Sequence, residues 1–327
     1  ITTEEAEGVI AAILLHDLGH GPFSHALEHV LIPEVSHETI SLLLMERMNH
    51  QFNGRLDVAI SIFKDEYPKR FLHQLVSGNL DMDRLDYLRR DSFFTGVSEG
   101  NIGSARIIKM LNVVDDRLVV EAKGIYSIEN YLMSRSLMYW QVYLHKTSLA
   151  AEKMLENLIL RARHLIAKGF SVPASPAFSH FLSTSLQPGV MDDTSLDHFI
   201  NLDDTDIWTA IKAWQTHDDF ILSLLSKGLI DRRLFKMEMT KEAPTTERLE
   251  NDITTLAATY GISQEDARFL TSLSMVTTNM YNAEVDSIDI LYNDGLIRPI
   301  TTASDMLNLD VLSKEVCKYA YCHVRIK

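Results

Sequence analysis

The longest helical pattern in this chain runs from about Ser127 to Lys168 and contains neither glycine nor proline. Helical patterns of that length commonly form the spine of a domain built from helices. Shorter apolar repeats with helical spacing precede it, at about residues 55–66, 69–77 and 80–92. We therefore expect a mainly α fold, with an all-α domain over residues 1–170.

The character of the sequence changes after "GFSVPASPAF", where Pro173 and Pro176 predict a surface loop. Helical patterns return at about residues 205–216, 218–227 and 245–259. Strand-like apolar or alternating runs follow, namely "RLFKMEM", "SMVTTNMY", "SIDILYNDGLIRPI" and "VCKYAYCHVRI". A hairpin is also expected around "LNVVDDRLVVEA", with Asp115 and Asp116 at its turn. Residues 171–327 are thus predicted to form a helical extension and a smaller mixed α/β region.

The composition narrows the classes of function. The 327 residues carry a formal net charge of −14, which argues against a surface that coats nucleic acid broadly. A polyanion can bind such a chain where arginine, lysine or a metal reverses the local field. No apolar run approaches the length of a membrane span. The two cysteines, Cys317 and Cys322, form no disulfide framework, so a reducing cytoplasmic location without a membrane partner is expected.

Histidine is concentrated near the beginning of the chain. Thr2-x-x-Glu5 predicts a capping box that opens an apolar helix, which runs into "HDLGHGPFSH". Pro22 suits the first turn of a second helix that ends before Pro33. Five of the 13 histidines lie within 22 residues, where an even distribution would place about one: His16, His20, His25, His29 and His37. His29 is expected on an outer face, and the tight spacing of the others indicates a site.

The adjacent His16 and Asp17 offer one nitrogen and one oxygen ligand, a pair that suits borderline divalent metal ions. Two ligands are too few, and "GNLDMDRLDYLRRD" at residues 78–91 is the obvious source of another. On a helix there, Asp83 shares a face with Tyr87. The sequence therefore predicts a metal site built from two segments that lie far apart along the chain.

These two segments carry a resemblance to a known family. "HDLGHGPFSH" and "DMDRLDYLRRD" resemble the HD-domain phosphohydrolases, and more narrowly the deoxynucleoside triphosphate triphosphohydrolases that include the SAM-and-HD-domain enzymes. The likeness continues through "SRSLMYWQVYLHK" at residues 134–146 and "RRLFK" at residues 232–236. Stringent-response (p)ppGpp hydrolases fit less well, because they carry a Glu-Asp pair where this chain has His20 and Gly21.

The resemblance implies a centre in which His16, Asp17 and Asp83 ligate one divalent ion. Its identity stays open among Mn²⁺, Mg²⁺, Fe²⁺, Ni²⁺, Co²⁺ and Zn²⁺. Family members supply a further histidine from an upstream Arg-x-x-His stretch, and residues 1–15 contain neither histidine nor arginine. Either the sequence begins after that stretch or the metal site is incomplete, and the initial Ile1 favours the first alternative.

The implied reaction is attack of water on the α-phosphorus of a dNTP, which releases the deoxynucleoside and tripolyphosphate. His20 matches a family position that contacts the α-phosphate. His25 matches the proton donor to the departing 5′-oxygen, a role that suits histidine near neutral pH. Glu28 and His37 match a carboxylate–histidine pair that supports this proton transfer, and Glu28 follows His25 by one helical turn.

Six residues match family positions that bind the substrate: Arg84, Tyr87, Asp91, Arg135, Tyr139 and Tyr143. The two arginines and Tyr87 correspond to contacts with the β- and γ-phosphates, which need cations and hydrogen-bond donors. Asp91 and Tyr143 correspond to the 3′-hydroxyl and the 2′ side of the sugar, which favours deoxyribose. Tyr139 stands where animal enzymes have histidine, and Arg84 stands where the family often has lysine.

Two other functions stay open at this point. The chain could be another nucleotide phosphohydrolase of the same superfamily, or a nucleotide-binding sensor that has lost catalysis. A true absence of the upstream Arg-x-x-His would favour the sensor. The resemblance also implies a homo-oligomer, either a dimer or a tetramer, and an activating nucleotide near Arg106 and Lys123.

Overall fold

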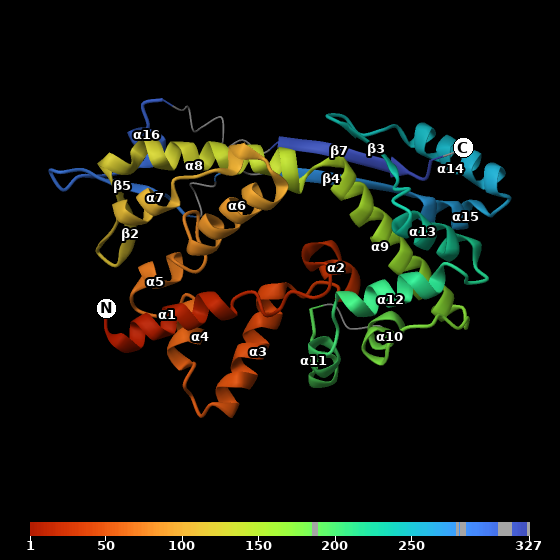
Figure 1. Ribbon diagram of the computed structural model, residues 1–327, viewed down its shortest axis with the longest axis horizontal. Helices are drawn as coiled ribbons and strands as arrows, with labels where there is room; N and C mark the ends of the chain where they lie inside the picture. The colour runs from red at the N-terminus through yellow and green to blue at the C-terminus, as the bar shows by residue number, and fades with distance from the viewer. Residues whose placement is uncertain (185–188, 279–280, 282–285, 307–315, 326–327) are drawn as a thin grey trace. The chain divides into compact units, whose positions relative to one another are not determined.

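The computed structural model describes residues 1–184, 189–278, 281, 286–306 and 316–325 (Figure 1). Helices dominate these residues, and the strands form two small sheets. The prediction of a mainly α fold followed by a mixed α/β C-terminal region is confirmed. None of the described helices combines the length and the apolarity needed to cross a lipid bilayer.

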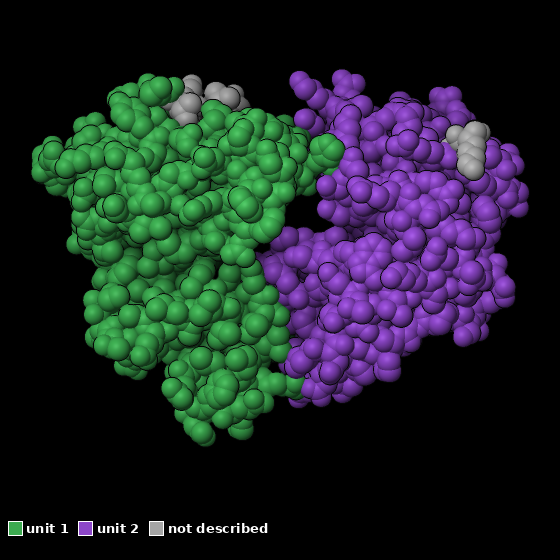
Figure 2. Space-filling model, viewed as in Figure 1, with its two compact units in different colours: residues 1–18, 41–145, 277–316 green, residues 19–40, 146–276, 317–327 purple. Residues whose placement is uncertain are grey.

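The chain divides into two compact units, and neither is continuous in sequence (Figure 2). Unit 1 comprises residues 1–18, 41–145 and 277–316, and unit 2 comprises residues 19–40, 146–276 and 317–327. The chain therefore passes from unit 1 to unit 2 directly after Leu18. The predicted boundary at residue 170 falls inside a segment of unit 2, and the functional division that it implies stays a prediction.

The helices of unit 1 are α1 (Thr3–Leu15), α4 (Asp57–Phe63), α5 (Arg70–Gln74), α6 (Met82–Thr95), α7 (Ser104–Met110), α8 (Ile125–Met138) and α16 (Ile300–Ala303), with 3₁₀ turns η2 (Ser98–Gly100) and η3 (Ala122–Gly124). Helix α3 (His37–Gln51) begins in unit 2 and continues in unit 1. Helix α1 packs against α4 and buries Ala12, while α6 and α8 bury Leu88 and Ile128 in a second cluster.

The predicted capping box at the start of α1 is present. The Thr2 hydroxyl accepts a hydrogen bond from the backbone N–H of Glu5 at 3.1 Å, and the Glu5 carboxylate accepts one from the N–H of Thr2 at 2.8 Å. The same carboxylate accepts hydrogen bonds from Tyr67 at 3.0 Å and Lys69 at 2.9 Å. These contacts fix the beginning of the helix whose other end carries His16.

A four-stranded sheet completes unit 1, with strands β1 (Leu111–Val114), β2 (Arg117–Glu121), β5 (Asp289–Leu291) and β6 (Ile297–Pro299) in the order β1-β2-β5-β6. Strands β1 and β2 form the predicted hairpin, and Asp115 and Asp116 at its turn have φ angles of 49° and 57°. Two positive φ angles in a row are what a tight two-residue hairpin turn requires. Strand β5 pairs in parallel with β2 and antiparallel with β6, so residues far apart in sequence join one sheet.

The prediction of a single long helix over residues 127–168 is wrong. Helix α8 ends at Met138 and is followed by the π-helical turn η4 (Tyr139–Tyr143), in which the N–H of Leu144 bonds to the carbonyl of Tyr139 at 2.7 Å. The next helix, α9 (Lys146–Ala167), belongs to unit 2. A π turn needs no glycine or proline, so helical spacing alone did not reveal the break, and such turns are frequent at functional sites.

Unit 2 contains α2 (Glu28–Leu31), α9, α10 (Pro176–Ser183), α11 (Asp193–Ile200), α12 (Asp204–Trp214), α13 (Phe220–Ile230), α14 (Thr246–Tyr260) and α15 (Gln264–Ala267), with 3₁₀ turns η1 (Ser24–Ala26) and η5 (Arg268–Leu270). Helix α9 packs against α13 (Figure 1). The core includes Leu158, Phe178, Trp214 and Leu222, all fully buried.

A second sheet has the strand order β3-β7-β4, formed by β3 (Lys236–Thr240), β7 (Val316–His323) and β4 (Thr271–Thr278). Strands β3 and β7 are antiparallel and place Glu238 opposite Tyr321. All three strands were expected from their apolar or alternating runs. The predicted strand "SMVTTNMY" extends over residues 279 and 280, which lie outside the described residues.

Candidate active site

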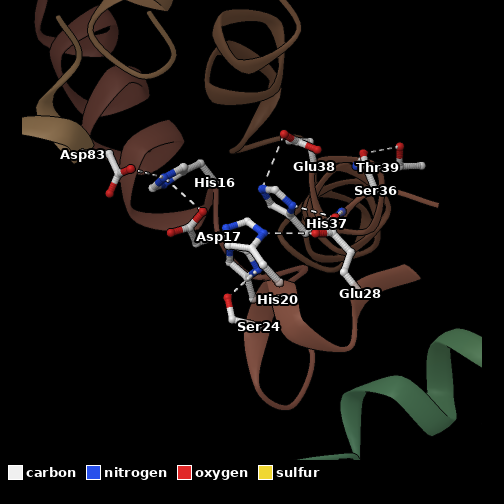
Figure 3. A network of polar contacts seen from close by, with 11 residues as sticks. His16, Asp17, His20, Ser24, Glu28, Ser36, His37, Glu38, Thr39 and Asp83 are labelled. Atoms are coloured by element: carbon white, nitrogen blue, oxygen red, sulfur yellow. Dashed lines mark hydrogen bonds and ion pairs between the residues drawn. The ribbon is translucent and has the colours of Figure 1, made fainter. Parts of the chain in front are cut away.

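The first group of site residues lies in unit 1, where α1 ends. His16 follows the last residue of α1, and its Nδ1 lies 2.6 Å from the carbonyl oxygen of Ile13. Its Nε2 lies 3.1 Å from Oδ1 of Asp17 and 3.9 Å from Oδ2 of Asp83 (Figure 3). Because the carbonyl can only accept, Nδ1 carries a proton and Nε2 is the nitrogen directed at the two carboxylates.

These three residues fit a divalent cation. One ligand atom from each of His16, Asp17 and Asp83 lies within 4.8 Å of the others. The pKa of His16 is raised to about 9, mainly by the carboxylate of Asp83 with a contribution from Asp17, although burial opposes the shift. The field at Nε2 thus favours positive charge, and one imidazole with two carboxylates is a donor set that such ions accept.

Asp83 is positioned by the beginning of α6. Asp81 caps this helix, because its carboxylate accepts the backbone N–H of Arg84 at 2.7 Å and that of Gly78 at 2.9 Å. The guanidinium of Arg84 returns to the same loop, with Nε 2.6 Å from the carbonyl of Gly78 and 3.0 Å from the Asp81 carboxylate. Burial raises the pKa of Asp81, and the charge of Arg84 opposes that shift. The loop therefore fixes Arg84 and presents Asp83 in the first helical turn.

Four aromatic and acidic residues of the predicted substrate site come together in unit 1. The hydroxyl of Tyr143 donates to Oδ2 of Asp91 at 2.6 Å. The ring of Tyr143 lies edge-on to those of Tyr87 and Tyr139, at centroid distances of 6.0 and 5.3 Å. Burial and the Asp91 carboxylate raise the pKa of Tyr143, so its hydroxyl keeps its proton as a donor. The π turn η4 supplies two of the three rings.

Arg135 on α8 is a buried cation without an acidic partner among the described residues. Its guanidinium lies over the ring of Tyr139 at 5.9 Å, and its Nη1 lies 3.5 Å from Oδ1 of Asn79. Its Nε has no hydrogen-bond partner within the described part of the chain, although the residue is only 6% exposed. Burial raises the pKa of Tyr87 to about 12, while the charges of Arg84 and Arg135 act on it in the opposite direction. The positive charges of both arginines therefore act on the ionisation of Tyr87.

The second group of site residues forms a histidine cluster in unit 2. Both oxygens of Glu28 are used. Oε1 lies 2.8 Å from Nδ1 of His37 (Figure 3), and Oε2 lies 3.1 Å from Nδ1 of His25. Oε1 also accepts the backbone N–H of His37 at 2.7 Å. His20 and His37 stack with centroids 4.0 Å apart, and Nδ1 of His20 lies 3.1 Å from the Ser24 hydroxyl. The four predicted residues of this group therefore lie together.

The electrostatics of this cluster centre on Glu28. Burial raises its pKa, but the backbone N–H of His37 and the rings of His25 and His37 lower it more, to about 2. Glu28 is therefore a carboxylate at neutral pH and can orient both imidazoles as a hydrogen-bond acceptor. The contact with His25 is the one expected from their spacing. His29, expected on an outer face, is exposed.

The turn between His20 and His25 differs from the prediction. The prediction of a helix that starts at Pro22 is wrong, because the chain forms the 3₁₀ turn η1 and then the short helix α2. Phe23 and Ser24 have φ angles of 57° and 49°, in a region that costs free energy for residues other than glycine. The N–H of Phe23 donates to Oδ1 of Asp204 at 2.9 Å, and its ring meets Trp208 at 5.5 Å.

Sequence reasoning missed three residues that hold this region. Asp204 and Trp208 on α12 support the turn, and Arg163 on α9 donates to the carbonyl oxygens of Val30, Leu31 and Phe181. The sequence around these three residues does not indicate their roles. Each contacts a segment more than a hundred residues away or bonds to a backbone carbonyl. The predicted activator residues lie apart from both groups in the sequence, with the Arg106 guanidinium donating to the Lys123 carbonyl at 3.0 Å.

Comparisons with known proteins agree with this picture. Residues 102–169 match the family model described as the HD associated region. The solved structure of a phosphohydrolase from Bacteroides thetaiotaomicron is 57% identical, with a TM-score of 0.95, over 99% of this chain and 81% of that chain. The uncharacterized protein YwfO of Bacillus subtilis is 36% identical over 238 residues, which are 71% of this chain and 53% of YwfO. This chain thus spans about half the length of that relative.

A more distant relative is the deoxynucleoside triphosphate triphosphohydrolase SAMHD1 homolog of Dictyostelium discoideum. It is 29% identical over 179 residues, which are 50% of this chain and 35% of that protein. The neighbour that is 57% identical over nearly all of this chain is a phosphohydrolase, and the matched family model describes an HD associated region. The chain belongs to the HD-domain phosphohydrolases.

Proposed function

We propose that this protein hydrolyses dNTPs to deoxynucleoside and tripolyphosphate. The observation that carries the proposal is Arg135, a buried guanidinium whose Nε lacks a partner among the described residues. A buried cation without an acidic partner is costly unless an anion completes it. Arg84 and Tyr87 lie together on α6, and we assign both of them to the polyphosphate beside Arg135.

The sugar end of the substrate is assigned to Asp91 and Tyr143. The Asp91 carboxylate can accept a hydrogen bond from the 3′-hydroxyl of a nucleotide, and the bond from Tyr143 holds it in place. The ring of Tyr143 limits the space beside the sugar, which favours deoxyribose over ribose. The Dictyostelium relative, a deoxynucleoside triphosphate triphosphohydrolase SAMHD1 homolog, supports this choice of substrate class.

We assign the metal-ligand role to His16, Asp17 and Asp83. A divalent ion, when bound, polarises phosphate oxygens and makes a bound water more acidic. The ring of His16 is held by the Ile13 carbonyl so that Nε2 stays directed at the two carboxylates. The native ion stays open among Mn²⁺, Mg²⁺, Fe²⁺, Ni²⁺, Co²⁺ and Zn²⁺.

Proton transfer is assigned to the cluster in unit 2. His25 donates a proton to the departing 5′-oxygen, Glu28 orients its ring through Nδ1, and His37 shares the same carboxylate. His20 contacts the α-phosphate. His20 follows Asp17 by three residues, and covalent geometry alone keeps their α-carbons within about 11 Å.

The experiment is product identification with the purified full-length protein, Mn²⁺ or Mg²⁺, and a panel of dNTPs and NTPs. We expect tripolyphosphate and deoxynucleoside from dNTPs, and little turnover of NTPs. Asp83→Ala should abolish turnover, whereas Asp86→Ala, an exposed carboxylate on the same helix, should not. Release of orthophosphate or pyrophosphate would point to another phosphohydrolase, and nucleotide binding without turnover would point to a sensor.

We further propose that the protein assembles as a dimer or tetramer and responds to an activating nucleotide near Arg106 and Lys123. Light scattering after size exclusion, with and without dNTPs, tests the assembly. A monomer under both conditions would contradict it. Activation should appear as turnover that rises more steeply than substrate concentration, and Arg106→Ala should remove that steepness.

A further inference from the structure

The loop of residues 75–81 in unit 1, which joins α5 to α6, contacts both arginines that we assign to the substrate. The guanidinium Nε of Arg84 donates to the backbone carbonyl of Gly78 at 2.6 Å. The guanidinium Nη1 of Arg135 lies 3.5 Å from the side-chain Oδ1 of the next residue, Asn79. Two adjacent loop residues thus contact one arginine from α6 and one from α8. A group that fixes this loop therefore limits the positions of both guanidinium groups.

Asp286, which lies 207 residues after Asn79 in the sequence, is bonded to this loop. Its Oδ2 accepts the backbone N–H of Asn79 at 2.8 Å, and its Oδ1 accepts a hydrogen bond from Nε2 of Gln74 at 3.1 Å. The backbone carbonyl of Asp286 accepts another hydrogen bond, from Nδ2 of Asn79. Asp286 thus holds both the backbone and the side chain of Asn79, and it joins the loop to the end of α5.

These contacts set the orientation of the Asn79 amide. Its NH₂ group donates to the Asp286 carbonyl, so the opposite atom, Oδ1, faces Arg135 as an acceptor. The backbone carbonyl of Asn79 accepts a hydrogen bond from the buried Tyr131 at 2.7 Å. Because a guanidinium is planar and rigid, a contact at Nη1 also limits the direction of Nε. The Nε of Arg135 is the donor without a partner among the described residues, so it is the one that a phosphate can use.

The residue type at position 78 fits the close approach of Asp286. A β-carbon on Gly78 would lie 3.0 Å from Oδ2 of Asp286 and 3.1 Å from the backbone carbonyl oxygen of Gln74. Both distances are shorter than an ordinary van der Waals contact, so a side chain there would displace the carboxylate or the loop. Glycine allows the two backbones and the carboxylate to lie this close together.

We propose that Asp286, acting through Asn79, positions the two arginines for the β- and γ-phosphates of the substrate. The role of Asp286 rests on the proposed function, which assigns Arg84 and Arg135 to the polyphosphate. Donors that are already held in place lose less side-chain entropy when they bind an anion. Loss of Asp286 should therefore weaken the contacts with the β- and γ-phosphates and leave those with the sugar and the α-phosphate.

Binding of a deoxynucleoside triphosphate is compared with binding of the corresponding monophosphate, which lacks the β- and γ-phosphates. Isothermal titration calorimetry uses the metal-loaded full-length protein with His25→Ala as the parent, because this substitution removes the proposed proton donor and leaves the nucleotide intact. We expect Asp286→Ala to weaken triphosphate binding about tenfold and to change monophosphate binding less than about twofold. Asp289→Ala is the matched control, since this carboxylate of the same segment accepts a hydrogen bond from the Ser287 hydroxyl at 2.9 Å. It should bind both nucleotides as the parent does.

A second comparison asks whether Asp286 acts through Arg135. In an Arg135→Met background, Asp286→Ala should weaken triphosphate binding less than about threefold, because one residue that it positions is already lost. Equal losses for the triphosphate and the monophosphate, or the full tenfold loss in the Arg135→Met background, would overturn the positioning role. Where Asp286→Ala fails to fold, Asp286→Asn replaces it. This variant keeps one acceptor oxygen and should show a smaller loss that is still confined to the triphosphate.

The parent protein decides the proposed function separately. A parent that binds the triphosphate no better than the monophosphate refutes the assignment of the arginines to the polyphosphate, and with it the role of Asp286. Wild-type protein that binds the triphosphate without turnover refutes hydrolysis alone, and the Asp286→Ala and Asp289→Ala chains still decide the positioning role. A preference for the triphosphate that is unchanged by Asp286→Ala overturns the positioning role alone.

Discussion

At the scale of single residues, the site depends on histidines that each use Nδ1 in a contact with another group of the protein. Nδ1 of His16 is held by a backbone carbonyl, and Glu28 divides its two oxygens between His25 and His37. Each such contact selects one tautomer and one orientation, leaving the other ring nitrogen for chemistry. The sequence predicts that these residues form a site, but the orientations of their rings depend on the fold.

Glu28→Gln tests the charge of that carboxylate through stability. The pKa of Glu28 is lowered in the folded chain to about 2, so its ionised form stabilises the fold above its ordinary pKa, and that stabilisation is lost as the pH falls toward 2. We expect Glu28→Gln to lower the free energy of unfolding by about 1–2 kcal/mol near pH 7 and by less near pH 3. Urea unfolding at both pH values measures this. Glu46→Gln, an exposed control, should show no such dependence, and an equal loss at both pH values would contradict the assignment.

Arg135 is the residue that most directly tests nucleotide binding. Its Nε lacks a partner among the described residues, so a bound phosphate would gain a charge-assisted hydrogen bond. We expect Arg135→Met to weaken dNTP binding by roughly ten- to a hundredfold, and Arg135→Lys to weaken it less, because lysine keeps the charge but not the planar fork. Isothermal titration calorimetry with metal-loaded protein that retains Asp83 measures the dNTP affinity of each variant. Arg89→Met, exposed on α6, is the control; equal affinities for the two Met variants would exclude Arg135 from the site.

At the scale of elements, those that depend on neighbouring residues were predicted, and those that depend on contacts with remote segments were not. The capping box of α1 and the Asp115-Asp116 hairpin follow from a few neighbouring residues, and both were predicted. The π turn η4 was not, because nothing in its residue types forbids a continuous helix. The short helices after Pro22 were missed for a related reason: the turn is held from α12, a segment about 180 residues further along the chain.

The strained turn before His25 yields a prediction at this scale. Asp204→Ala removes the acceptor for the N–H of Phe23, while Asp204→Asn keeps an oxygen that can accept it. We expect the alanine variant to lose about 1 kcal/mol of stability, and the asparagine variant to stay close to wild type. Turnover of dNTPs should also fall with Asp204→Ala, since His20 and His25 flank the turn. Identical behaviour of the two variants would show that the Asp204 oxygen does not hold the turn.

At the scale of the whole molecule, the two groups of site residues belong to different compact units. His16, Asp17 and Asp83 lie in unit 1, whereas His20, His25, Glu28 and His37 lie in unit 2. The sequence places both groups around one motif, and only the structure shows that the chain changes units after Leu18. Substitutions can therefore be made in either group within a single unit.

Removal of the metal provides the final prediction. An ion at His16, Asp17 and Asp83 joins segments 67 residues apart and binds only the folded chain, so it should raise the unfolding temperature. At about a hundredfold excess over Kd the gain is about 2.7 kcal/mol, which corresponds to several degrees for a unit of this size. Scanning calorimetry with Mn²⁺ and with EDTA measures the shift. Asp86→Ala should retain it and Asp83→Ala should lose it; a shift of equal size in the Asp83→Ala chain would place the bound Mn²⁺ elsewhere.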